Sequence, residues 1–267
     1  MALRARLTPL PKPVPEIWPW HSVKSKGVSV SILGRGDRRM EAETYLSSGF
    51  SIRQSIERQR DGWFPIGDIA DVWMPGRLKG IQVAKGAGTP FFSATQVFDI
   101  RPTPRKWLAV ERTPDAANRF VDSGQVLVTC SGAVGRATLA FEAHKNVLIS
   151  HDLLRIDAKE SKWKGWIYAF LHTPQARAMT TASHYGHIIK HLEPSHLMAI
   201  PIPAIDDATA TTFNKSVARI VALRDKAYTL TLEAEAKFTE AIGSLDVKDW
   251  GEKCSVENPI CLPICDA

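Results

Sequence analysis

The chain has 267 residues, enough to bury a core in one large domain or in one domain with appendages. Apolar residues make up 44% of it and charged residues 23%, which is the ordinary range for soluble proteins. No run of about 18 apolar residues occurs, which excludes a membrane-spanning helix, and the net charge of +6 favours a polyanionic partner.

The four cysteines do not suggest a metal centre or a disulfide framework. Residues 1–15 lack the apolar core of a secretory signal, so we expect a cytoplasmic, reducing location. Three cysteines crowd the tail as Cys254-x6-Cys261-x3-Cys265, which does not match the paired short spacings of a zinc site. We interpret this segment as a loose tail with incidental thiols, and Cys130 as a buried core thiol.

Composition and hydrophobic period divide the chain into five segments. The sequence predicts a proline-rich arm at 1–36, a partly helical segment at 37–60, a loop-and-strand domain at 61–205, a long helix at 206–243 and a tail at 244–267. Because the strands come first and the long helix follows them, the predicted fold class is α+β, mostly β in the domain itself.

In the first part of the chain the sequence pattern changes from one typical of helices to one typical of strands. Charges of both signs alternate with apolar residues over 37–60, and Gly49 is expected to break this helical run. From Gly62 on, short apolar stretches are bounded by glycine and proline, which is typical of strands. Strands are expected within 91–97, 125–130, 134–141, 147–149 and 153–156, with the second and third joined as a hairpin by the turn Ser131-Gly132.

The apolar period then becomes helical. The spacing Trp163-x2-Trp166-Ile167-x2-Phe170-Leu171 predicts an amphipathic helix. A second short helix is expected to start at Thr173-Pro174, because an early proline lacks only an N–H that has no helical partner. Residues 184–192 are interpreted as strand or loop, and 200–204 as extended, because each proline forces its predecessor out of helical geometry.

Residues 206–242 form the clearest predicted helix. Asp206 or Asp207 can cap its start, and Gly243 is expected to end it. Its 35 residues from Ala208 to Ile242 correspond to a length of about 52 Å. A helix of this length exceeds a small domain, so we expect a partner along it in a coiled-coil-like pairing.

Signals for catalysis are weak. Asn258-Pro-Ile-Cys261 lacks the second proline and the aromatic ring with which adenine methylases hold the target amine, and Gly34-Arg-Gly36 lacks the third glycine of a dinucleotide loop. Glu235-Ala-Lys237 matches a nuclease motif only in its letters, because side chains two apart on a helix do not face each other. We therefore expect no catalytic residue and no cofactor.

Histidines cluster at His184, His187 and His191. On a helix, His187 and His191 would share a face and could bind a metal ion. The glycine and the β-branched residues Ile188 and Ile189 argue against a helix there. We therefore favour polar surface histidines in a nucleic-acid-binding loop, with no metal expected and metal binding as the alternative.

The positive signals are for binding. Basic side chains that can neutralise phosphates include Lys79, Lys145 and Arg155, and Thr129 is among the polar side chains that can contact base edges. The alternative is that most of the basic residues are ordinary solvated surface. The candidate DNA-binding residues are Lys85, Thr89, Gln96, Arg101, Arg105, Lys106, Ser131, Arg136, His151, His184, Tyr185, His187, Lys190 and His191.

Four blocks, in this order, resemble the specificity subunit of type I restriction–modification systems. The individual motifs are degenerate, whereas their order and spacing together are fairly specific. The resemblance covers about residues 39–243. Its blocks are Arg39–Tyr45, Trp63–Ile69, Ser123–Gly135 followed by Ile149–Ile156, and Tyr185–His191 followed by Ile200–Pro203.

The resemblance implies a target recognition domain at 61–205, a spacer and dimerisation helix at 206–243, and no catalysis by the chain itself. Members of the family dock double-stranded DNA against DNA methyltransferase subunits, and restriction subunits can join. They usually carry two recognition domains and two helices, whereas this sequence has room for one. We therefore expect a homodimer or pairing with a second half-subunit. The alternatives are a DNA-modifying enzyme with degenerate motifs and a subunit that serves assembly alone.

Overall fold

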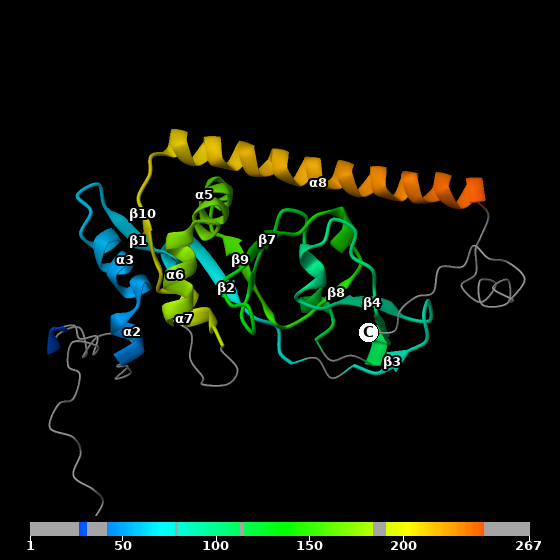
Figure 1. The fold of residues 1–267 in the computed structure, drawn as a ribbon, viewed down its shortest axis with the longest axis horizontal. Helices are drawn as coiled ribbons and strands as arrows, with labels where there is room; N and C mark the ends of the chain where they lie inside the picture. The colour runs from blue at the N-terminus through cyan, green and yellow to red at the C-terminus, as the bar shows by residue number, and fades with distance from the viewer. Residues whose placement is uncertain (1–26, 31–41, 78–79, 113–114, 184–190, 243–267) are drawn as a thin grey trace, which may run out of the picture. The chain divides into compact units, whose positions relative to one another are not determined.

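The computed structural model describes residues 27–30, 42–77, 80–112, 115–183 and 191–242 (Figure 1). The chain forms two compact units, Met1–Ser47 and Ser48–Ala267. The first unit contributes α2 (Ala42–Leu46). The second unit holds the strands and the remaining helices described below.

Six α-helices of the described residues belong to the second unit, together with short 3-10 turns. The helices are α3 (Ser48–Glu57), α4 (Ile66–Ile69), α5 (Ser161–Leu171), α6 (Pro174–Ser183), α7 (Pro194–Met198) and α8 (Asp207–Ile242) of α type, and the turns are η2 (Gln96–Phe98), η3 (Val110–Arg112), η4 (Ala117–Arg119) and η5 (Glu142–His144). Proline is the first residue of both α6 and α7, where its missing N–H costs no helical hydrogen bond.

The six α-helices α3 to α8 and the strands form one packed body, in which the strands of the described residues make three sheets. The first pairs β1 (Trp63–Pro65) antiparallel with β10 (Pro201–Pro203). The second is antiparallel throughout, in the order β2 (Ala70–Trp73), β9 (Leu153–Ala158), β6 (Val126–Thr129) and β7 (Ala137–Leu139). The third has the order β3 (Gln82–Val83), β5 (Lys106–Leu108), β4 (Thr89–Phe92) and β8 (Leu148–Ile149), with β4 and β8 parallel.

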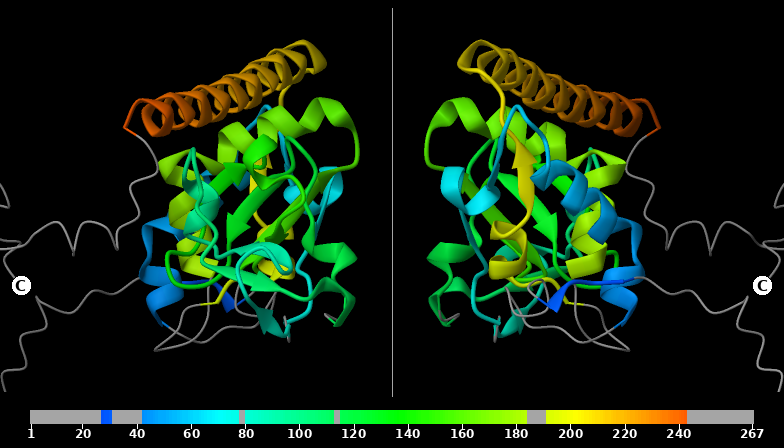
Figure 2. Two further views of the ribbon diagram at one scale, coloured as in Figure 1. Left: turned by 90° about the vertical axis from the view of Figure 1, so that its right-hand side faces the viewer. Right: turned by 90° about the vertical axis from the view of Figure 1, so that its left-hand side faces the viewer.

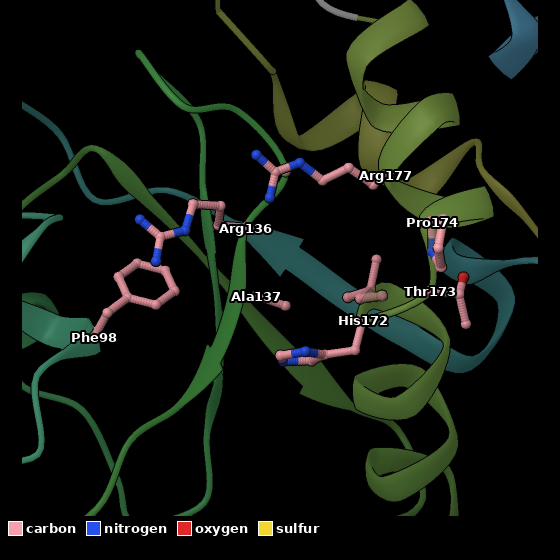
Figure 3. A pocket seen from close by; sticks show the side chains of 9 residues that line it. Phe98, Arg136, Ala137, His172, Thr173, Pro174 and Arg177 are labelled. Carbon is pink, nitrogen blue, oxygen red and sulfur yellow. The ribbon is translucent and has the colours of Figure 1, made fainter.

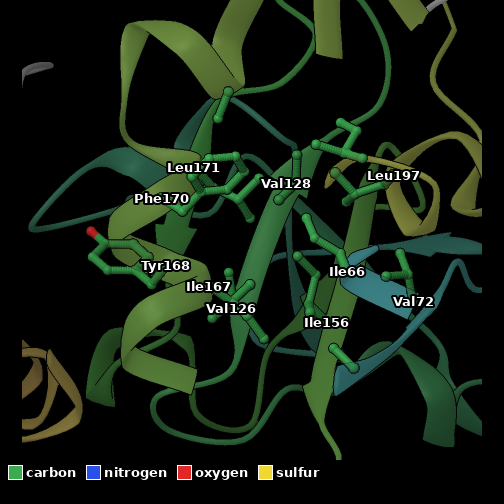
Figure 4. Packing of buried hydrophobic residues seen from close by; sticks show 14 of the residues in the cluster. Ile66, Val72, Val126, Val128, Ile156, Ile167, Tyr168, Phe170, Leu171 and Leu197 are labelled. Atoms are coloured by element: carbon green, nitrogen blue, oxygen red, sulfur yellow. The ribbon is translucent and has the colours of Figure 1, made fainter. Parts of the chain in front are cut away.

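Strand β6 is buried on both faces. Successive side chains of a strand point to opposite sides, so Val126 and Val128 face one cluster of apolar residues while Leu127 faces another. Figure 4 shows the first cluster, in which Ile167 and Phe170 of α5 lie against β6. Full burial of each such side chain contributes about 1.5–3 kcal/mol. This two-sided burial explains why β6 is a continuous apolar run in the sequence.

Several sequence predictions are confirmed. The fold is mixed α and β, with one long helix after the strands. The predicted hairpin is formed by β6 and β7, the amphipathic helix is α5, and the proline-containing segment 201–203 is extended. The strand expected within 91–97 is shorter, because it ends at Phe92 and gives way to η2.

The prediction that Gly49 breaks the first helical run is wrong. The interruption lies at Ser47, and Gly49 lies inside α3. A Cβ atom at this position would come within 2.2 Å of the carbonyl oxygen of Ala178 in α6. Glycine is therefore needed for the close approach of α3 to α6, not for ending a helix.

Helix α8 has 36 residues, which corresponds to about 54 Å. Asp206 caps its start as predicted, because its side chain accepts a 2.7 Å hydrogen bond from the backbone N–H of Thr209. The helix runs along the unit across α5 and η5 (Figures 1 and 2). Gly243, which was expected to end it, lies outside the described residues.

The first half of α8 packs on its own domain, against helix α5 and strand β7. The rings of Phe213 and Trp166 lie 5.0 Å apart, and Arg224 donates hydrogen bonds to Thr138 and to the Leu139 carbonyl. On another side of the helix, the apolar side chains Leu223, Leu230 and Phe238 are more than half exposed, at 56%, 51% and 64%. The described residues therefore leave an exposed apolar face on α8 between Leu223 and Phe238. Among the described residues, no helix combines the length and the apolar character that a membrane-spanning helix needs.

Candidate nucleic-acid interface

The two predicted recognition blocks meet at the turn between β6 and β7. The N–H of Leu192 donates a 2.8 Å hydrogen bond to the Cys130 carbonyl, and Ser131 and His191 form an isolated antiparallel bridge. His191 directly follows residues 184–190, which lie outside the described residues. The end of the second block is thus fixed against the turn of the first, across about 60 positions of sequence.

Asp152 accepts hydrogen bonds from side chains at and beside the same turn. Its carboxylate accepts hydrogen bonds from the Ser131 hydroxyl at 3.0 Å and from the Ser150 hydroxyl at 2.8 Å. His151 is half-buried, and its Nε2 atom lies 3.7 Å from the same carboxylate. Three of the predicted residues, Ser131, His151 and His191, are therefore gathered at one point, and we call them with Asp152 the Ser131 junction.

A second set of predicted residues lies on or beside the third sheet. Lys106 begins β5 and Thr89 begins β4, while Lys85 lies in the turn between β3 and β4 and Arg105 directly precedes β5. The three cations are exposed, and none of them forms an ion pair with a described residue. Strand β4 pairs with β8, after which Ser150 begins the segment that leads into the Ser131 junction.

Two predicted residues have their polar groups engaged within the chain. Gln96 is buried, its side-chain oxygen accepts a 3.0 Å hydrogen bond from the N–H of Ser93, and its amide nitrogen donates to the Thr103 carbonyl. Arg101 forms an ion pair with Glu235 of α8. Gln96 therefore holds a loop in shape, and Arg101 ties that loop to the second half of α8.

Arg136 occupies a third place, at a pocket of about 450 Å³ between the β6–β7 hairpin and the α5–α6 junction (Figure 3). Its guanidinium carbon lies 4.0 Å from the centre of the Phe98 ring. Arg177 and His172 also line the pocket, and the sequence prediction missed both. Only the packing of α6 against the hairpin reveals them, because Arg177 is otherwise an ordinary polar residue of a short helix.

Two further polar residues that the sequence suggested for DNA contacts are buried. Arg155 is fully buried and donates hydrogen bonds to the carbonyls of Ile149, Ser150 and Leu153. Burial lowers its pKa to about 10. Thr129 is also buried, and its hydroxyl donates to the Ala133 carbonyl. Both side chains support the strands and the turn, so contacts from them to phosphates or bases are excluded in this arrangement.

Cys130 is a buried thiol, as the sequence predicted. Burial, with the nearby charge of Asp152 adding to it, raises the pKa of this thiol to about 12. The thiol therefore stays protonated at neutral pH and is a poor nucleophile. In the part of the chain that the structure describes, no three His, Cys, Asp or Glu side chains lie close enough to hold a metal ion.

Several predicted residues lie outside the described residues. They are Lys79, His184, Tyr185, His187, Lys190, the tail cysteines Cys254, Cys261 and Cys265, and the segments 34–36 and 258–261.

Comparison with known proteins gives partial structural likenesses. No family model matches the chain, and no curated protein sequence matches it. An HsdS subunit from Thermoanaerobacter tengcongensis is similar with a TM-score of 0.41 and 18% identity, over 67% of this chain and 45% of that one. The S subunit of a type I restriction–modification system from M. genitalium is similar with a TM-score of 0.44 and 16% identity, over 73% and 49%.

A third solved structure, of a type I restriction–modification system, has a TM-score of 0.42 and 22% identity over 74% of this chain and 50% of that one. These neighbours are of the family that the sequence blocks resemble. The chain spans about half the length of each.

Proposed function

We propose that the chain is a cytoplasmic specificity subunit that recognises a short sequence in double-stranded DNA and directs a methyltransferase or restriction complex to it, without catalysis of its own. The observation that carries this proposal is the convergence of the two recognition blocks at the Ser131 junction. A hydrogen bond from Leu192 to Cys130 and the bridge between Ser131 and His191 hold the end of the histidine-containing segment against the hairpin turn. Polar side chains gathered on a rigid turn suit the reading of base edges.

The exposed cations beside the third sheet suit the backbone of the same DNA. Lys85, Arg105 and Lys106 carry charges that no described carboxylate neutralises by an ion pair. Such side chains displace counterions from phosphates, which supplies affinity that does not depend on sequence. Phosphate contacts of this kind would position the duplex, while the Ser131 junction and the adjacent segment 184–190 would read it.

Binding to DNA is tested by measuring the affinity of the full chain for duplexes at several salt concentrations. We expect the affinity to fall steeply with salt. In a plot of the logarithm of the binding constant against the logarithm of the salt concentration, the slope should become less steep by about one in Lys85→Gln and in Lys106→Gln. Lys215→Gln is a matched control, because Lys215 is an exposed lysine on α8. Absence of duplex binding even at low salt contradicts the proposal.

Sequence recognition needs a separate test. Selection from a random duplex library should enrich one short word, and His187→Ala should relax a single position of it by about 1–3 kcal/mol. Uniform affinity across the library would contradict sequence recognition, whereas partner binding without any DNA affinity would identify a subunit that serves assembly only. Methyl transfer by the purified chain alone with S-adenosylmethionine would instead identify an enzyme.

We also propose that the exposed face of α8 pairs with a second copy of the chain or with a second half-subunit. Leu223, Ala227, Leu230, Ala234 and Phe238 are spaced three or four residues apart and therefore share one face. This face lies about 100° around the helix from the side that contacts the domain, as 3.6 residues per turn require. Pairing along it would leave the domain contacts of α8 intact.

A further inference from the structure

The pocket beside Arg136 has the charge of an anion-binding site. Arg136 and Arg177 line it together, and none of the described residues that line it is acidic. Neither arginine forms an ion pair with a described carboxylate, and the contact of Arg136 with the Phe98 ring does not neutralise its charge. Figure 3 shows Arg177 extending from α6 toward Arg136. Two arginines that line one pocket favour a ligand with negatively charged oxygens.

The start of α6 adds to this potential. Thr173 and Pro174 line the pocket, so the positive end of a ten-residue helix lies at its wall. The Thr173 hydroxyl accepts a 3.1 Å hydrogen bond from the N–H of Ala176, which is thereby satisfied. The helix therefore contributes through its dipole, while the hydrogen bonds to a ligand would come from the arginines.

The wall of the pocket depends on a close contact between the hairpin and α6. Gly135 has a φ of +79°, and a Cβ atom there would lie 2.2 Å from the hydroxyl oxygen of Thr180. Only glycine allows this approach, which holds the backbone beside Arg136 against the helix that carries Arg177. The backbone that carries Arg136 and the helix that carries Arg177 are therefore held in direct contact, and both side chains line the same pocket.

Size indicates what the anion is attached to. A volume of about 450 Å³ is within the range of small-molecule sites and exceeds what one phosphate group needs. The anionic group therefore enters with part of the molecule that carries it. Arg136 is five residues from Ser131 on the same hairpin, so a DNA strand at the Ser131 junction would pass beside the pocket.

We infer that this pocket binds a phosphate group of the DNA backbone, an assignment that rests on the DNA-binding function proposed above. Arg136 and Arg177 would each donate hydrogen bonds to the phosphate oxygens, and His172 would close the other side. The same chemistry suits free phosphate, so the test separates these two sources.

The first arm measures duplex affinity against salt for the full chain. Arg177→Gln and Arg136→Gln should each lower the affinity about tenfold and the salt slope by about one, for every duplex sequence. Arg136→Lys keeps the charge and the apolar stem and should restore most of the slope, which separates charge from folding. Arg219→Gln, an exposed arginine on α8, is the matched control and should change neither quantity.

The second arm uses inorganic phosphate alone, followed by NMR of the arginine and histidine side chains. Saturable shifts at Arg136, Arg177 and His172 that vanish in Arg177→Gln support the site. Burial, with the charge of Arg224 adding to it, lowers the pKa of His172, and a bound phosphate should raise that pKa. Chloride at equal ionic strength should produce none of these changes.

The outcomes separate the pocket from the proposed function. If no duplex binds, the proposed function is contradicted, and so is the assignment of the pocket to a phosphate group of DNA. The NMR titration with inorganic phosphate still decides whether the pocket binds an anion. If inorganic phosphate binds but the salt dependence of duplex affinity is unchanged in both glutamine variants, the pocket binds phosphate that does not come from the DNA backbone, and our inference is wrong. If the salt dependence is unchanged in both variants and inorganic phosphate causes no saturable NMR shift, the pocket is not an anion-binding site.

Discussion

The Ser131 hydroxyl donates a 3.0 Å hydrogen bond to the carboxylate of Asp152, and this contact joins the two halves of the central sequence block. The backbone repeats the connection, since the N–H of Cys130 donates to the Asp152 carbonyl at 3.0 Å. Ser150 donates to the other carboxylate oxygen. Asp152 is an acidic residue in a region proposed to bind DNA, and these hydrogen bonds explain its presence there. It supports the turn and is not needed as a contact to the duplex.

Removal of this carboxylate should destabilise the second unit. Asp152→Ala leaves the hydroxyls of Ser131 and Ser150 without their acceptor, for which we expect a loss of about 1–3 kcal/mol in the free energy of unfolding. Chemical denaturation measures it. Asp99→Ala is the control, because Asp99 is exposed and forms no ion pair with a described residue. Equal stability of the two variants would contradict a supporting role for Asp152.

Glycine to alanine inside a helix normally stabilises it by about 1 kcal/mol, but Gly165 should behave in the opposite way. A Cβ atom at this position in α5 would lie 2.3 Å from the backbone nitrogen of Asn214 in α8. Gly165→Ala should therefore push the two helices apart and lower the free energy of unfolding by about 1–3 kcal/mol. Thermal or chemical unfolding measures this change.

Gly76→Ala provides the control for that substitution, since nothing lies within 4 Å of a Cβ atom at Gly76 and its φ is not positive. Its stability should stay within about 0.5 kcal/mol of the unsubstituted chain. A Gly165→Ala variant that is as stable as the Gly76→Ala variant would show that α8 can shift on α5 without cost.

Local patterns predicted the elements of this fold, and tertiary contacts decided the rest. The spacing of Trp163, Ile167 and Phe170 predicted α5 because a helix presents one face to the core, and that face is buried. The turn at Ser131 predicted the hairpin because turn residues act within a few positions. The role of Gly49 could not be predicted, because its reason is the approach of Ala178 from a distant helix.

The same distinction holds for the candidate interface. Gln96 and Arg155 have the chemistry of DNA-contacting residues, and burial alone removes them from the surface. Arg177 was missed for the converse reason, since only the packing of α6 places it beside Arg136. A residue type reports which interactions a side chain can make, whereas exposure and partners depend on the packed chain.

Pairing through α8 should depend on its exposed apolar face. The double substitution Leu223→Glu and Leu230→Glu places two charges on this face, where desolvation makes burial in a helix pair unfavourable. We expect a concentration-dependent dimer for the unsubstituted chain and a monomer for the variant, as measured by light scattering or sedimentation. Thr229→Glu is the control, because Thr229 is exposed on another side of the helix and should leave the dimer intact.

The opposite result would also be informative about the partner. A chain that is monomeric at all concentrations, with or without these substitutions, would contradict self-pairing and leave a second half-subunit as the partner. In that case the double variant should fail to join that half-subunit, which co-purification of the two chains would reveal.

His144 should make the stability depend on pH. It is buried, its Nδ1 atom accepts a 3.1 Å hydrogen bond from the N–H of Phe141, and burial lowers its pKa from 6.5 to about 4. Between these two values the unfolded chain binds a proton that the folded chain does not. The free energy of unfolding should therefore fall as the pH decreases from about 6.5 to about 4, by up to about 3 kcal/mol, and this contribution should be constant above that window.

His144→Asn isolates this contribution, because the asparagine oxygen can replace Nδ1 as the acceptor for Phe141 and does not titrate. The variant should be less stable than the unsubstituted chain at pH 7, because a smaller side chain packs less well against Phe92 and Phe141. The difference between the two proteins should then shrink as the pH falls through the window. Parallel pH profiles would mean that His144 is protonated in the folded chain or that its site opens to water before the unit unfolds.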